Sequence, residues 1–68
     1  MNVPVIKNQQ YEMTIVDIGS EGEGIGKIDD FTVFVPNAVK GDRIEAKILK
    51  VKKNFAFGKL ISIIEPLL

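Results

Sequence analysis

The chain has 68 residues, of which 46% are hydrophobic, 9 are basic and 9 are acidic. This length allows one small domain, and the hydrophobic content excludes an intrinsically disordered chain. Cysteine and histidine are both missing, which excludes a disulfide framework, a thiolate metal site and histidine-based acid–base catalysis.

No charged and then apolar leader follows Met1, and the apolar runs are far shorter than the ~20 residues that span a bilayer. We therefore expect a cytoplasmic protein that has no membrane partner. We also expect it to be a monomer.

The N-terminal part of the chain predicts a loose arm followed by a strand. Residues 1–10 contain Pro4 and show no hydrophobic period. From Tyr11 to Ile18, apolar and polar residues alternate at first, but Val16 and Ile18 fall on the opposite parity. A curled strand or a β-bulge accommodates such a slip.

Two short strands, Gly24–Ile28 and Phe31–Val35, flank the dipeptide Asp29-Asp30. A two-residue turn pairs Ile28 with Phe31, and directly paired residues share a face of the sheet. Asp-Asp is not the favoured sequence for such a turn. The predicted core face consists of Gly24, Gly26, Ile28, Phe31, Val33 and Val35, and the predicted outer face consists of Ile25, Lys27, Thr32 and Phe34.

The second half of the chain predicts two longer strands. Pro36 cannot donate a ladder hydrogen bond, so the preceding strand ends there and a loop follows to Asp42. In the strand Arg43–Lys53 the apolar parity flips after Ile48, which predicts a bulge near Ile48 and Leu49. The last strand covers Phe55–Ile64.

These five strands have short connections, and no segment is typical of an amphipathic helix. A sheet without a covering helix must close on itself to bury its apolar face. The sequence therefore predicts an all-β fold: a small five-stranded antiparallel curled barrel. The barrel domain is expected over residues 11–65, after the arm of residues 1–10.

The sequence offers little for catalysis. Ser20 and Ser62 have no base at motif spacing, and Gly26-Lys27 lacks the remainder of a phosphate-binding loop. The acidic residues Glu21, Glu23, Asp29 and Asp30 match no calcium-loop spacing. We expect no enzymatic activity, no catalytic residues, no metal site and no cofactor.

Charge is unevenly distributed along the chain. Residues 1–39 hold two basic and six acidic residues, whereas residues 40–68 hold seven basic and three acidic residues, so the halves carry −4 and +4. Such a split favours either a basic binding face or an ordinary solvated strand face.

The segment Lys50–Lys59 places lysines around Phe55 and Phe57. If Ala56 and Gly58 point into the barrel, both rings point outward, where bases can stack on them while lysines neutralise phosphates. In the alternative interpretation, at least one of the two rings fills the core.

Glycines, an apolar strand ending in proline, a Gly-Asp turn and a group of lysines follow one another in a set order: Gly22, Gly24, Ile25, Gly26, Lys27, Val33, Phe34, Val35, Pro36, Ala38, Val39, Gly41, Asp42, Lys50, Lys52 and Lys53. Taken together, these residues resemble a TRAM domain over about Tyr11 to Glu65. The resemblance implies an RNA-binding five-stranded barrel that is similar to the OB-fold. Such a barrel is often appended to tRNA- or rRNA-modifying enzymes, such as uridine methyltransferases and methylthiotransferases. It also implies a likeness to stand-alone archaeal TRAM proteins, which are thought to act as RNA chaperones.

We therefore expect a sequence-tolerant RNA-binding module whose partner is tRNA, rRNA or mRNA. One alternative is a protein-binding barrel with an apolar patch of Phe34, Phe57 and Ile61. Another is a detached domain that targets a modifying enzyme to RNA. The predicted RNA-binding residues are Lys27, Phe34, Arg43, Lys47, Lys50, Lys52, Lys53, Phe55, Phe57 and Lys59.

Overall fold

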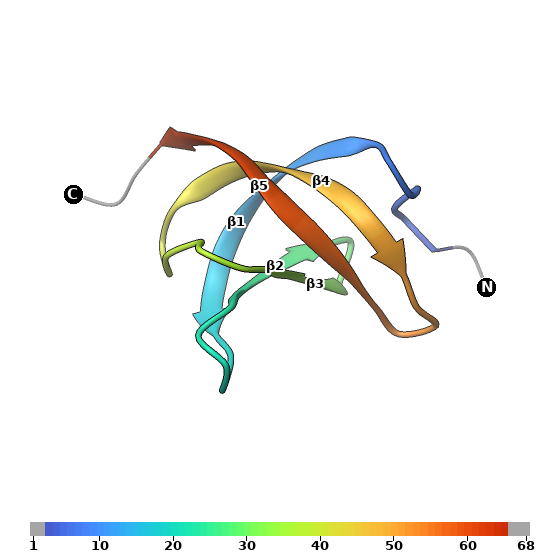
Figure 1. Cartoon of the computed structure of the whole chain (residues 1–68), viewed down its shortest axis with the longest axis horizontal. Coiled ribbons are helices and arrows are strands. Elements are labelled where there is room, and N and C mark those ends of the chain that lie inside the picture. Colours follow the sequence, from blue (N-terminus) through green and yellow to red (C-terminus); the bar gives the residue numbers. More distant parts are fainter. Residues whose placement is uncertain (1–2, 66–68) are drawn as a thin grey trace.

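The computed structural model describes residues 3–65, which form a closed barrel of five strands. The strands are β1 (Gln10–Ile18), β2 (Gly24–Ile28), β3 (Phe31–Val35), β4 (Arg43–Val51) and β5 (Phe55–Glu65). Their order around the barrel is β1-β2-β3-β5-β4, with β4 pairing back to β1. Figure 1 shows the long β5 strand crossing in front of the short β2–β3 hairpin.

One of the five strand pairs differs from the expected antiparallel arrangement. β3 and β5 pair in parallel, with Phe34 opposite Phe57, and the other four pairs are antiparallel. The strand that lies between β3 and β5 in the sequence, β4, pairs with β5 and β1 instead, so β5 reaches β3 with the same direction. The barrel is therefore all-β but mixed.

The β2–β3 hairpin has the predicted register, with Ile28 opposite Phe31 and Ile25 opposite Phe34. Asp29 and Asp30 both have positive φ, 49° and 67°. A type I′ turn needs positive φ at both central residues, and aspartate tolerates this conformation better than most non-glycine residues do. The turn therefore forms without glycine and fixes which residues face outward.

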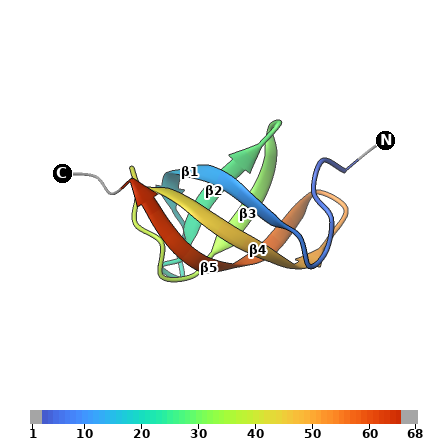
Figure 2. The same cartoon turned by 90° about the horizontal axis from the view of Figure 1, so that it is seen from above.

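Bulges adjust the longer strands. The β4–β5 register shifts between Ile48 and Lys50, which confirms the predicted bulge at Leu49. The β1–β2 register shifts between Ile15 and Asp17, where the sequence predicted a curl or a bulge. At both irregularities, the extra residue allows the apolar side chains on either side of it to face the interior of a strongly curved sheet. Figure 2 shows β4 and β5 curving side by side.

The barrel interior is narrow and is filled by small and medium side chains. A Cβ added at Gly26 would lie 2.6 Å from Met13 Sδ, and one added at Gly24 would lie 2.7 Å from Ala38 Cβ. The β2 glycines thus leave room for bulkier residues of neighbouring elements. The buried core comprises Val5, Met13, Ile15, Val33, Val35, Ala38, Ile44, Ala46, Ile48 and Ala56.

The described part of the expected N-terminal arm, residues 3–9, contacts the barrel. Val5 is buried in the core. The Asn8 N–H donates to the Ile48 carbonyl at 2.7 Å, and the Ile48 N–H donates to the Gln9 carbonyl at 2.9 Å. These contacts attach the segment to β4 immediately before the bulge.

The position of the β4 bulge can be tested by substituting two neighbouring residues, Ile48 and Leu49. Ile48 is fully buried, whereas the Leu49 side chain is 46% exposed. Ile48→Ala should lower the free energy of unfolding by about 2–5 kcal/mol, because it leaves a cavity in the core. Leu49→Ala should change it by about 0.5 kcal/mol or less. Chemical denaturation of the two variants measures this difference, and a larger loss in Leu49→Ala would contradict the register.

Candidate nucleic-acid interface

Strand β5 presents two aromatic rings on the outside of the barrel. Ala56 and Gly58 are buried, and a Cβ added at Gly58 would contact the Lys47 carbonyl oxygen at 3.2 Å. Because side chains alternate along a strand, Phe55 and Phe57 must then point outward. Phe57 is 40% exposed, and Phe55 is half-buried. The interpretation in which Phe57 fills the core is therefore wrong.

Phe34 reaches the same surface from β3. The hairpin register places it opposite Ile25 on the outer face, and the parallel ladder places it beside Phe57. The three rings form one cluster, which we call the aromatic trio: Phe34, Phe55 and Phe57. Ring centroids are separated by 5.6 Å for Phe34–Phe55, 5.8 Å for Phe34–Phe57 and 5.3 Å for Phe55–Phe57.

The packing within the aromatic trio limits how it can hold a base. Phe55 meets both neighbours edge to face, at interplanar angles of 78° and 89°, so these contacts occupy ring surface. Stacked planes lie about 3.4 Å apart, so a base inserted between two rings needs a separation of about 6.8 Å. Phe34 and Phe57 are closer than this. A base must therefore stack on the outside of the trio, and Phe57 is its most exposed ring.

Lysines lie on both sides of the aromatic trio. On one side, Lys27 of β2 is opposite Thr32, which is itself opposite Phe55. On the other side, Lys50 of β4 is directly opposite Phe57. Lys59 follows Phe57 by two residues and is paired with Lys47. The strand order thus brings Lys27 of β2 to the same surface as the lysines of β4 and β5, which are consecutive strands much later in the sequence.

The β4–β5 turn adds two more cations. The Lys52 N–H donates to the Phe55 carbonyl at 2.7 Å, which holds the turn against the trio. A side-chain hydrogen bond with Lys50, together with charge repulsion from it, lowers the pKa of Lys52 below its usual 10.5. Lys53 is exposed in the same turn. An anion placed between Lys50 and Lys52 would relieve this repulsion.

Arg43, also predicted as an RNA-binding residue, lies elsewhere. It is at the start of β4, opposite Thr14 of β1. Its guanidinium forms an ion pair with Glu12 at 3.0 Å and donates to Thr14 Oγ1 at 3.0 Å. Lys50 is seven residues further along the strand, or roughly 20 Å away at the rise of a β-strand. The other predicted residues are the trio itself and the lysines around it: Lys27, Lys47, Lys50, Lys52, Lys53 and Lys59.

Within residues 3–65 there is no group of three or more acidic residues placed to hold a metal ion. The same part of the chain contains no helix that is long and apolar enough to cross a membrane.

The structure also contains a hollow that the sequence did not predict, and its lining on β5 begins at Gly58, the residue after Phe57. Its volume is about 260 Å³, and it is lined by Pro36, Asn37, Leu49, Gly58, Lys59 and Leu60. It depends on the parallel β3–β5 pairing, which the alternation of apolar residues cannot reveal. Only the likeness to the OB-fold could have indicated this pairing from the sequence, because that fold has a characteristic strand order.

Comparisons with known proteins agree with this architecture. Over 93% of its length, the chain is 65% identical to an uncharacterized RNA methyltransferase of Clostridium acetobutylicum. A second uncharacterized RNA methyltransferase, from Clostridium tetani, is 51% identical over 96% of the chain. The chain spans only 14% of the length of each of these relatives.

A solution structure of a conserved protein from Methanococcus maripaludis superimposes with a TM-score of 0.84 at 52% identity. The match covers 88% of this chain and 86% of the archaeal one, so that protein consists almost entirely of the same barrel. The TRAM domain family model matches residues 4–61. The chain therefore belongs to the TRAM domain family.

Proposed function

We propose that the chain is an RNA-binding module that holds unpaired bases on the aromatic trio and phosphates on the surrounding lysines. The observation that carries the proposal is the contact between three outward phenylalanines within 6 Å of one another, with Lys27 and Lys50 on opposite sides. Stacking on aromatic rings combined with a cationic surface is the usual means of binding single strands with little sequence preference.

The relatives support RNA as the ligand. Two of them are named RNA methyltransferases, and the barrel accounts for a small part of their length. A binding module in such proteins would bring RNA, such as tRNA or rRNA, to a separate catalytic domain. The same sequence-tolerant contacts suit an RNA chaperone, which holds exposed bases transiently. In either setting the barrel binds RNA in the cytoplasm and catalyses nothing itself.

A protein-binding barrel is the second candidate. It is favoured by one observation, the exposure of Phe57 together with Ile61, Ile63 and Ile64 on β5. An apolar protein contact depends weakly on salt, whereas binding to phosphates depends on it steeply.

Salt dependence tests the proposal. If three to five lysines contact phosphates, a plot of log K against log salt for a single-stranded RNA should have a slope of about −2 to −3.5. Lys50→Gln should make the slope shallower by about 0.7, because one phosphate contact is lost. Arg43→Gln is the matched control and should leave the slope unchanged, since Arg43 is paired with Glu12. Fluorescence anisotropy titrations at several salt concentrations measure the slopes, and a slope near zero would contradict RNA binding.

Stacking is tested by Phe57→Leu, which keeps an apolar side chain but removes the ring. RNA binding should weaken by about 1–3 kcal/mol, the usual contribution of one stacked base. The melting temperature should change little, because Phe57 is 40% exposed. Ile63→Leu serves as the control, since Ile63 is also exposed but lies outside the trio. Equal RNA affinity in Phe57→Leu and the unmodified chain would show that Phe57 does not stack.

A further inference from the structure

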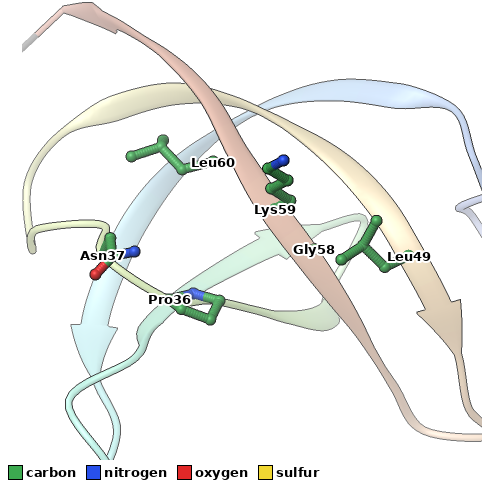
Figure 3. A pocket seen from close by; sticks show the side chains of 6 residues that line it. All are labelled: Pro36, Asn37, Leu49, Gly58, Lys59 and Leu60. Atoms are coloured by element: carbon green, nitrogen blue, oxygen red, sulfur yellow. The ribbon is translucent and has the colours of Figure 1, made fainter.

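The hollow beside the aromatic trio has the features of a site for one nucleobase. Pro36, Leu49 and Leu60 supply apolar walls, and Lys59 supplies a cation at the rim. Asn37 contributes the side-chain amide, a group that donates and accepts hydrogen bonds at once. Figure 3 shows Pro36 and Asn37 on one side of β5 and Leu49 on the other, with Lys59 and Leu60 on the strand itself.

The local backbone keeps this hollow open. Beyond the Phe34–Phe57 pair, the described β3–β5 ladder ends, because Pro36 has no N–H to continue it. The Ala38 N–H donates to the Val35 carbonyl at 3.4 Å, and Asn37 has a φ of 71°. Proline followed by a residue of positive φ is the pattern of a type II turn. This turn carries the chain away from β5 and leaves its edge near Gly58 and Leu60 without a strand partner from β3.

Acidic residues on the far side of the Pro36–Asn37 turn indicate whether the base or the phosphate of a nucleotide enters the hollow. A second hollow of about 220 Å³ shares Pro36 and Asn37 and is lined by Glu21, Gly22 and Glu23. Phosphates are repelled from these carboxylates and attracted to the lysines of β4 and β5. An RNA backbone is thus kept on the lysine side, from which only an uncharged base can reach Asn37.

We propose that this hollow is a base-reading subsite, in which the nucleobase next to the one stacked on Phe57 is recognised at its edge by the Asn37 amide and by the open β5 backbone. The inference rests on the proposed RNA binding. It adds a modest base preference to a surface that is otherwise sequence-tolerant. Stacking strength and strand flexibility also produce modest preferences, but those preferences do not depend on the Asn37 amide.

The test compares the unmodified chain with Asn37→Gly. Glycine adopts positive φ without strain, so the turn is kept while the amide is removed. The probes are RNA hexamers of uridine, cytidine and adenosine, titrated by fluorescence anisotropy. The unmodified chain should prefer one hexamer by about 3- to 10-fold, the range expected for a single net hydrogen bond. Asn37→Gly should bind all three within about 2-fold of one another, with the salt slope unchanged.

Three outcomes oppose the proposal in distinguishable ways. If the unmodified chain does not discriminate, or if Asn37→Gly discriminates equally well, the subsite is wrong while RNA binding stands. If no hexamer binds in a salt-dependent manner, the proposed function fails as well. If Asn37→Gly does not fold, NMR of the unmodified chain replaces it. The Asn37 side-chain amide signals must then shift on adding the preferred hexamer, and unshifted signals would overturn the subsite.

Discussion

The narrow interior of the barrel is the constraint on which the rest of the structure depends. Gly24 and Gly26 of β2 and Ala56 and Gly58 of β5 all face inward, where the packing leaves little space for larger side chains. A strand whose inward positions are small must carry its bulky residues on the outside. The rings of Phe55 and Phe57 are thereby placed on the outside of the barrel, where a contiguous exposed apolar patch is typical of an interaction site.

The order of the strands in the barrel then places lysines that are spread along the sequence around the aromatic trio. The lysines of the C-terminal half are on β4, β5 and their turn, and the closed order β1-β2-β3-β5-β4 places Lys27 of β2 on the opposite side of the trio. Net charge over the whole chain is zero. The acidic residues at Glu21 and Glu23 lie across the Pro36–Asn37 turn, away from the trio. A neutral protein thus carries a group of lysines around the trio and a pair of carboxylates beyond the turn. Under the proposed function, this asymmetry would orient a bound RNA strand.

Much of this arrangement could be predicted from local sequence. The Ile28–Phe31 register follows from a two-residue turn, and the Leu49 bulge follows from a change of parity, because both depend on residues close in the chain. The parallel β3–β5 pair could not be derived this way, since it joins residues more than twenty positions apart and depends on where β4 lies. The contact of Phe34 with Phe55, the hollow at Asn37 and the Arg43–Glu12 ion pair are all consequences of such distant pairings.

Under the proposed function, RNA binds on the outer face of β2, β3, β5 and the adjoining end of β4, around the aromatic trio. This claim is tested most directly by two-dimensional NMR of the isotope-labelled chain titrated with a uridine hexamer. We expect the largest amide shifts near Phe34, Phe57 and Lys50, which adjoin one another in the barrel. Shifts concentrated instead around the Arg43–Glu12 ion pair, or at the end of β5 near Ile63, would contradict it.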